Sequence, residues 1–296
     1  MVRFVLCHGG AGSDAADEDG PRAACQRGQE ILDAGQSALE AAVAATACLE
    51  DDVRFNAGTG SNLRLDGKTI EMDAACMSSD GAFGAVAAIQ RVKNPVQVAQ
   101  RVSDTPHILL AGEGATAFAR RCGFDEHDPG SSRAVRRFEQ LLSVQERIGE
   151  WSLEGLRQAW NFDAPIEDAL GGDTVGALAW DGGSFAAALS SGGTTAALRG
   201  RVGDVPLPGC GLYAGPAGAV AATGDGEYIA RAILAYRAYR RLEEGYSAEA
   251  VVDWALAELS ADIDIGLLIA NEAGFAGSAR HGMAWYGRSD GKESSD

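Results

Sequence analysis

Short apolar runs recur along the chain, and between them lie longer segments whose apolar residues repeat every three or four positions. The short runs predict buried strands, and the longer segments predict amphipathic helices. The first run, 2–7, leads into His8-Gly9-Gly10-Ala11-Gly12, which predicts a strand that ends in a glycine turn. Further strands are predicted at 83–90, 107–110, 174–180, 184–189, 217–223, 265–270 and 283–286.

Helical spacing between residues 21 and 49 is interrupted at Gly35-Gln36, which predicts two helices there. Alternation from Leu63 to Met77, with Asp66-Gly67 between the halves, predicts a β-hairpin. Pro95 begins a helix at a position where proline is tolerated. Other helices are predicted at 113–121, 228–242 and 248–259.

The stretch from about 125 to 173 is charged and polar, with helical periodicity at 134–148 and 152–160. We interpret it as a partly helical, mobile tether between two structured parts. The tail after Arg288 is polar, and we expect it to be disordered. Strands and helices occur in both structured parts without strict alternation, which favours an α+β fold with antiparallel sheets flanked by helices.

Composition is that of a globular protein with a buried core. The chain has 296 residues, of which 46% are hydrophobic and 23% charged. Its apolar runs are shorter than the roughly 18 residues of a membrane helix, and the N-terminus lacks a secretory pattern. We therefore expect a soluble, cytoplasmic protein with no membrane partner.

The net charge of −17 disfavours nucleic acid as a partner, because a polyanion would be repelled. Only three of the 25 basic residues are lysines, at positions 68, 93 and 292. A carboxylate-rich, lysine-poor surface is typical of proteins from halophilic microbes, where salt screens the self-repulsion.

Cysteine and histidine positions do not suggest a cofactor. The six cysteines form no CxxC pair and the four histidines are scattered, so zinc-ligand spacing is missing. We expect the cysteines to be reduced, mostly buried thiols.

Glycine patterns suggest two further classes of site, and both fit poorly. Residues 112–117 and 209–214 match GxGxxA, but neither opens a βαβ unit with an acidic residue about 20 positions on. Residues 287–291 match GxSxG, yet they lie in the polar tail with no helix to follow. Dinucleotide binding and serine-hydrolase chemistry are therefore disfavoured.

A threonine at the start of an apolar strand offers a different chemistry. Gly171-Gly172-Asp173-Thr174-Val175-Gly176 follows the tether directly. If the chain were cut before Thr174, one residue would carry both a hydroxyl and an α-amine. That amine has a pKa of about 7.7–8 and can accept the hydroxyl proton, so no histidine or cysteine is required. On this segment alone, a plain structural threonine remains the better interpretation.

Several separated segments together resemble the plant-type asparaginase and isoaspartyl peptidase family, a family of N-terminal-nucleophile hydrolases. The resemblance covers nearly the whole chain outside the tether and the tail. Its blocks are 8–12 (HGGAG), 55–60 (FNAGTG), 71–74 (EMDA), 93–95 (KNP), 110–114 (LAGEG), 171–176 (GGDTVG), 190–193 (SSGG), 200–204 (GRVGD) and 223–227 (TGDGE).

The resemblance implies a four-layer αββα sandwich made as an inactive precursor. Self-cleavage between Asp173 and Thr174 would give an α chain, 1–173, and a β chain, 174–296, which together form one domain. Thr174 would then attack the side-chain amide of L-asparagine or of a β-aspartyl dipeptide and release aspartate. Family habit also implies a homodimer of αβ units.

Roles for individual residues follow from the resemblance. Arg201 would clamp the substrate α-carboxylate and Asp204 would pair with the α-ammonium. Thr223 and Gly224 would form the oxyanion hole. The remaining implied site residues are Gly226 in the same substrate loop, Asn56 as support for the nucleophile, and Ser191, which keeps the hydroxyl of the threonine usual beside the nucleophile.

Three alternatives stay open, and one of them is a family member that never cleaves itself. Asp173 precedes the nucleophile as in glycosylasparaginases, whereas the His8 motif favours the asparaginase side. Outside the family, the alternative is a non-catalytic binding protein with a degenerate site. The resemblance also implies that a loop folds around a sodium ion through the backbone carbonyls of Leu49, Glu50, Asp52 and Phe55.

Overall fold

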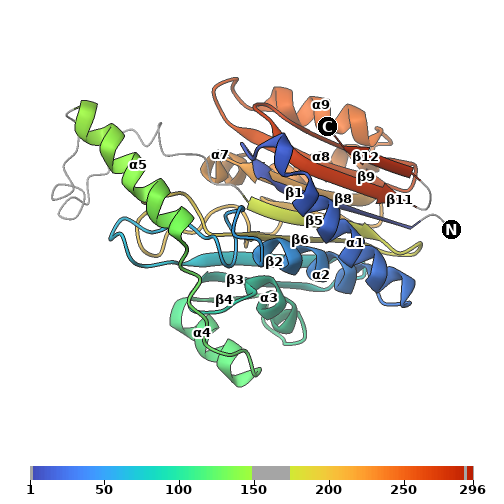
Figure 1. Cartoon of the computed structure of the whole chain (residues 1–296). Helices are drawn as coiled ribbons and strands as arrows, with labels where there is room; N and C mark the ends of the chain where they lie inside the picture. Colours follow the sequence, from blue (N-terminus) through green and yellow to red (C-terminus); the bar gives the residue numbers. More distant parts are fainter. Residues whose placement is uncertain (1–2, 149–173, 290–291, 296) are drawn as a thin grey trace.

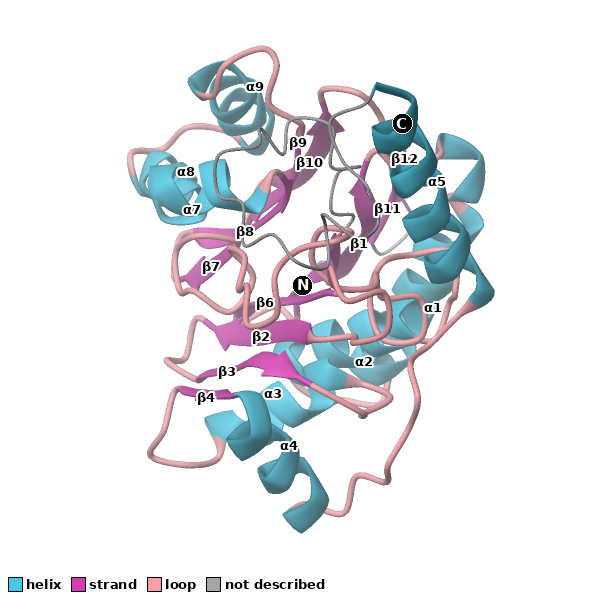
Figure 2. Ribbon diagram, turned by 90° about the vertical axis from the view of Figure 1, so that its left-hand side faces the viewer, coloured by secondary structure: helices cyan, strands magenta, loops and turns pink. Residues whose placement is uncertain are grey.

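The computed structural model describes residues 3–148, 174–289 and 292–295. Two β-sheets lie face to face, with helices on their outer sides (Figure 1; Figure 2). The larger sheet has eight strands in the order β12-β11-β1-β5-β6-β2-β3-β4 and is antiparallel except for the β3–β4 pair. Its strands are β1 (Phe4–Ala11), β2 (Met72–Ser78), β3 (Phe83–Ile89), β4 (Leu109–Ala111), β5 (Thr174–Trp180), β6 (Phe185–Ser191), β11 (Met283–Ser289) and β12 (Lys292–Ser295).

The smaller sheet is antiparallel, with the order β10-β9-β8-β7. Its inner strands, β8 and β9, are almost entirely buried, which fits their continuous apolar sequences. The four strands are β7 (Leu212–Gly215), β8 (Gly218–Gly224), β9 (Ile265–Asn271) and β10 (Gly274–Ala279).

Three clusters of buried side chains hold these layers together. One lies between the larger sheet and the first helices, one between the two sheets, and one between the smaller sheet and α8 and α9. The architecture is therefore α+β, as predicted. The helical segments are η1 (Ala15–Asp17), α1 (Asp19–Asp33), α2 (Ala38–Glu50), α3 (Pro95–Ser103), α4 (Gly112–Arg121), α5 (Ser132–Ile148), α7 (Gly226–Ala232), α8 (Leu234–Glu243) and α9 (Ala248–Glu258).

Most predicted elements are confirmed. The break at Gly35-Gln36 separates α1 from α2, and Ser37 caps α2 with a capping box. Pro95 is the first residue of α3, and β5 begins at Thr174. Clear caps and uninterrupted apolar runs marked these boundaries.

The glycine turn predicted at 8–12 is present but begins later, because β1 continues to Ala11 and the turn is closed by Ser13 N–H bonding to Gly10 O (3.1 Å). A Cβ atom on Gly9 would lie 2.3 Å from the Phe55 ring. Gly9 therefore allows the Phe55 ring to pack directly against β1, and it does not form part of the turn.

The predicted hairpin is only half correct. Asp66 accepts hydrogen bonds from the N–H groups of Lys68 and Thr69, so the turn is present. Its first arm is a loop that bonds to another loop, through Leu65 N–H to Ala197 O (2.9 Å), instead of pairing with β2.

The single helix predicted at 228–242 is two helices. Ile233 has a left-handed φ of 49° and ends α7, after which α8 begins. A β-branched residue in that conformation is strained, and apolar periodicity carries no sign of it.

The disorder predicted after Arg288 is also wrong for 292–295, because β12 pairs with β11.

Part of the 125–173 segment is the helix α5, which extends away from the sheets (Figure 1). Its first turns are docked, since Ala134, Phe138 and Leu141 are buried. The helix predicted at 152–160 and Asp173 lie outside the described residues.

The cysteines match the prediction of free thiols. All six are unpaired and four are buried, whereas Cys48 is half-buried and Cys122 is exposed. Among the described residues, no helix is both long and apolar enough to cross a membrane.

Candidate active site

Strand register brings three polar side chains together at one end of the larger sheet. Thr174, the first residue of β5, pairs with Ser191 at the end of β6. Ser191 in turn pairs with Asp73 of β2. All three are buried. Pairing of central strands thus brings Asp73 close to two residues that lie more than 100 positions further along the sequence.

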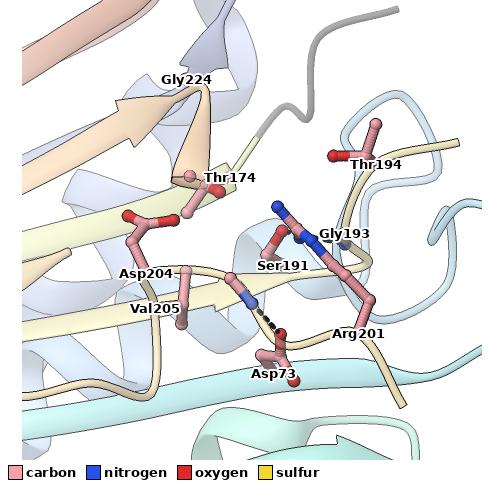
Figure 3. A pocket seen from close by; sticks show the side chains of 11 residues that line it. Asp73, Thr174, Ser191, Gly193, Thr194, Arg201, Asp204, Val205 and Gly224 are labelled. Carbon is pink, nitrogen blue, oxygen red and sulfur yellow. Dashed lines mark hydrogen bonds between the residues drawn. The ribbon is translucent and has the colours of Figure 1, made fainter. Parts of the chain in front are cut away.

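These residues line a pocket together with the loop after β6 and the first turn of α7 (Figure 3). The pocket contains six of the predicted site residues, Thr174, Ser191, Arg201, Asp204, Gly224 and Gly226. Its remaining lining residues are Asp73, Gly193, Thr194, Gly203 and Val205.

Thr223 contacts the backbone of Thr174 from β8. Its hydroxyl oxygen accepts hydrogen bonds from the N–H of Ala11 (3.1 Å) and of Thr174 (3.3 Å), and its O–H lies 3.4 Å from the carbonyl oxygen of Thr174. The side chain is fully buried. A hydroxyl is therefore fixed beside the start of β5.

Gly224 follows Thr223 and cannot be replaced without strain. Its φ is 127°, and a Cβ atom would lie 2.2 Å from the carbonyl oxygen of Asp264. Only glycine allows the backbone to continue from β8 into the pocket wall here.

Asn56 acts on the pocket through a loop rather than lining it. Its side-chain amide donates to Gly193 O (2.8 Å) and accepts from Asn62 N–H (2.9 Å), and its backbone carbonyl accepts from Gly192 N–H (2.9 Å). Ser191 Oγ accepts from Gly193 N–H (3.0 Å). Asn56 and Ser191 therefore both hold the Gly192–Gly193 turn, next to Thr174.

Arg201 is a largely but not fully buried cation with a matched anion. Glu227 accepts hydrogen bonds from its Nε (2.8 Å) and Nη2 (2.6 Å) atoms. Burial opposes the charge on Arg201, but the ion pair with Glu227 outweighs it, so the pKa of Arg201 is raised. The guanidinium stays charged inside the pocket.

Asp204 lies on the other side of the pocket (Figure 3). Burial raises the pKa of its carboxyl to about 7. Its Oδ2 atom has no hydrogen-bond partner among the described residues. A buried carboxylate in this state would be stabilised by a cationic ligand.

Gly226 separates these two opposite charges. A Cβ atom built on it would lie 2.7 Å from Asp204 Oδ1 and 3.1 Å from Arg201 Nη2. A side chain at position 226 would therefore press on both groups, which a carboxylate and an ammonium of one small molecule would have to reach.

Gly226→Ala is expected to reduce kcat/KM for the proposed substrate about a hundredfold, because small misplacements in a site carry costs of this order. Steady-state kinetics would measure it. Gly114→Ala is the matched control, since a Cβ on Gly114 meets no atom within 4 Å. Equal kinetics in the two variants would show that the space beside Gly226 is not used.

Two pocket contributors were missed as site residues, although their motifs were recognised. Asp73 accepts hydrogen bonds from Ala88 N–H (2.8 Å) and Gly203 N–H (3.2 Å), and burial raises its pKa. Glu227 pairs with Arg201. Both residues lie within segments that carry the family resemblance, 71–74 and 223–227, but the resemblance assigned neither of them a role.

A second buried arginine fixes the backbone under Arg201. Arg64 is fully buried, its Nε lies 3.3 Å from Glu71 Oε2, and its Nη2 donates to the carbonyl oxygen of Arg201 (3.1 Å). Glu71 also accepts from Gly200 N–H (2.6 Å). Arg64 and Glu71 therefore hold the backbone on both sides of the Gly200–Arg201 peptide, at Gly200 N–H and at Arg201 O.

His8 lies beside this site without the properties of a proton carrier. It pairs with Gly176 across β1 and β5, and burial lowers its pKa to about 3. The imidazole is therefore neutral at ordinary pH.

The carbonyls implied for sodium binding come from the end of α2 and the following loop. Leu49 O and Asp52 O each accept a local backbone hydrogen bond, and Glu50 O accepts from Thr59 N–H (2.9 Å). Carbonyl oxygens are suitable sodium ligands, and each retains a second lone pair. Backbone hydrogen bonds within the loop already hold its shape. A sodium site formed by these three carbonyls and that of Phe55 stays a prediction.

Fold and pocket define an α+β protein with a polar, charge-paired site at the start of a central strand. Comparison with known proteins identifies the family within this class. A profile of the asparaginase family matches residues 1–295. A plant-type L-asparaginase of Pyrococcus furiosus is 40% identical over 260 residues, which cover 85% of this chain and 83% of that protein.

Two other relatives are named as isoaspartyl peptidases. An isoaspartyl peptidase/L-asparaginase of Danio rerio is 36% identical, over 99% of this chain and 94% of its own length. An isoaspartyl peptidase of Escherichia coli is 38% identical, over 78% and 74%. The chain belongs to the asparaginase family of plant-type L-asparaginases and isoaspartyl peptidases.

Proposed function

We propose that this protein is a self-cleaving amidohydrolase that releases L-aspartate from L-asparagine, from β-aspartyl dipeptides, or from both. The observation that carries the proposal is one pocket in which Thr174 faces the opposite charges of Arg201 and Asp204. The layered sheets and helices support an αββα sandwich of the N-terminal-nucleophile type.

Self-cleavage would begin with attack of the Thr174 hydroxyl on the carbonyl carbon of Asp173. The peptide C–N bond breaks as the Thr174 nitrogen takes a proton, and an ester joins the two parts of the chain. Water then hydrolyses the ester, which leaves a carboxylate on Asp173 and a free α-amine on Thr174. The α chain is 1–173 and the β chain 174–296.

In the mature enzyme the Thr174 α-amine accepts the proton of its own hydroxyl, and the oxygen attacks the substrate amide carbon. The Thr223 hydroxyl and the Gly224 N–H stabilise the negative charge that develops on the carbonyl oxygen. Ammonia or the amine of a peptide leaves with the proton. Water then hydrolyses the β-aspartyl ester and frees Thr174 and aspartate.

Recognition depends on the zwitterionic end of the substrate. Arg201 binds the α-carboxylate through charge-assisted hydrogen bonds, and Asp204 binds the α-ammonium. An ammonium beside Asp204 favours the ionised carboxylate, which offsets the effect of burial on its pKa. Asn56 and Ser191 position the loop around Gly193, as their hydrogen bonds indicate.

A comparison of substrates tests the proposal. We expect ammonia from L-asparagine or aspartate from β-aspartyl dipeptides, with kcat/KM at least about tenfold above that for a glycosylated asparagine, a difference of roughly 1.4 kcal/mol. The alternative, a glycosylasparaginase, is favoured by Asp173 before the nucleophile. Hydrolysis of the glycosylated asparagine alone would establish that alternative, and no hydrolysis of any of the three would favour a non-catalytic binding protein.

Further proposals concern the setting of the enzyme. The net charge of −17 and the scarcity of lysine support a salt-rich cytoplasm as its environment. A homodimer of αβ units and a structural sodium ion follow from the family alone.

A further inference from the structure

Glu227 occupies a defined place in the carboxylate subsite. It is the second residue of α7, directly after Gly226, and its two oxygens bind Arg201 side-on. The Arg201 side chain is 16% exposed, whereas that of Glu227 is 52% exposed. The anion therefore holds the buried cation from the solvent side.

This contact decides which edge of the guanidinium remains available. A guanidinium has five N–H donors in a rigid plane, and Glu227 uses one from Nε and one from Nη2. The remaining edge, formed by Nη1 and Nη2, extends between glycines. Built Cβ atoms would lie 2.9 Å from Nη1 at Gly203 and 3.1 Å from Nη2 at Gly226. The Nη1–Nη2 edge therefore lies close against two glycines of the pocket lining, which carry no side chain to cover it, and Asp204 lies across the pocket from Arg201 (Figure 3).

We infer that Glu227 is a positioning residue that holds Arg201 so that its Nη1–Nη2 edge faces the substrate α-carboxylate. The inference rests on the proposed function, since it assumes a substrate with that group. Glu227 does not contact the substrate. It acts by fixing a long side chain that would otherwise lose rotamer entropy on binding.

Removal of Glu227 would also have an opposite effect on the affinity of Arg201 for the substrate carboxylate. Glu227 also offsets the charge of Arg201, so its removal would strengthen the attraction for a carboxylate. Solvent screens a half-exposed carboxylate, which weakens this effect. The effect of Glu227 on the orientation of the Arg201 guanidinium is not screened by solvent. We therefore expect the loss of orientation to outweigh the gain in attraction.

The test compares Glu227→Gln with wild type in the mature enzyme. KM for L-asparagine should rise about tenfold, the equivalent of one charge-assisted hydrogen bond, while kcat changes less than about twofold. As a second measure, the inhibition constant of L-aspartate should rise by the same factor. That of β-alanine, which lacks the α-carboxylate, should stay unchanged. Glu227→Asp, which keeps the charge on a shorter stem, should recover part of the loss.

Glu249→Gln is the matched control, because Glu249 is an exposed acidic residue in the first turn of α9. It reports the loss of a carboxylate from a helix N-terminus away from the pocket, and its kinetics should equal those of wild type.

Three outcomes would overturn the inference. They are an unchanged or lower KM in Glu227→Gln, a rise shared equally by L-aspartate and β-alanine, or a fall in kcat as large as the change in KM. If wild type itself hydrolyses no substrate with an α-carboxylate, the proposed function fails first.

Discussion

Thr174→Ala is expected to remain a single full-length chain without amidase activity. Alanine keeps the strand start but removes the only hydroxyl that the proposal uses as nucleophile. Wild type should split into pieces of about 18 and about 13 kDa on a denaturing gel, because the chain of 30.6 kDa averages about 0.10 kDa per residue. Activity of the variant should fall at least about 10⁴-fold, as when other nucleophiles are deleted.

Thr174→Ser serves as the matched control, since it retains the hydroxyl and loses one methyl group. It should cleave and hydrolyse, although more slowly. Equal cleavage in wild type and Thr174→Ala would remove Thr174 from the chemistry of maturation. An active Thr174→Ala variant would also remove it from turnover.

Thr223→Val is expected to lower kcat by about 10²–10³-fold, the usual effect of losing one oxyanion-hole donor. Valine has nearly the same shape, so the pocket should keep its outline. The change also removes the acceptor for two buried N–H groups, of Ala11 and Thr174. Denaturant unfolding should therefore show a loss of about 1–3 kcal/mol in the free energy of unfolding.

Thr223→Ser separates the two effects, because it keeps the hydroxyl. Its kcat should stay within about tenfold of wild type, a change below the loss of a whole donor. If Thr223→Val and Thr223→Ser had equal kcat values, the hydroxyl would play no part in stabilising the transition state.

The apolar pattern predicts the central strands well, but of the edge strands that the structure describes it predicts β4 and misses β7, β10 and β12. β5, β6, β8 and β9 are buried, so their apolar runs are unbroken. β7, β10 and β12 stand at sheet edges, where polar and glycine residues are tolerated, so their sequences lack the apolar run of a buried strand, although each pairs with the strand next to it in sequence.

The site divides in a similar way. Residue types with a specific chemistry, such as Thr174 and Arg201, were recognised from their motifs and meet in the pocket. The contact between Arg201 and Glu227 spans 26 positions and depends on where α7 begins. The apolar pattern predicts a helix only from 228, so the start of α7 at Gly226, and with it the ion pair, could be found only from coordinates.

The roles of Asn56 and Asp73 show the same limit. Their side chains bond to backbone groups of Gly193 and Gly203, which contribute no side-chain pattern of their own. Such loop-holding contacts follow from strand register and turn geometry, and neither is encoded within a short motif.

N-terminal sequencing of the smaller fragment of purified wild-type protein tests the central claim most directly. The account predicts one new N-terminus that begins Thr174-Val175-Gly176-Ala177. A chain that stays in one piece, or a fragment that begins at any other residue, would contradict it.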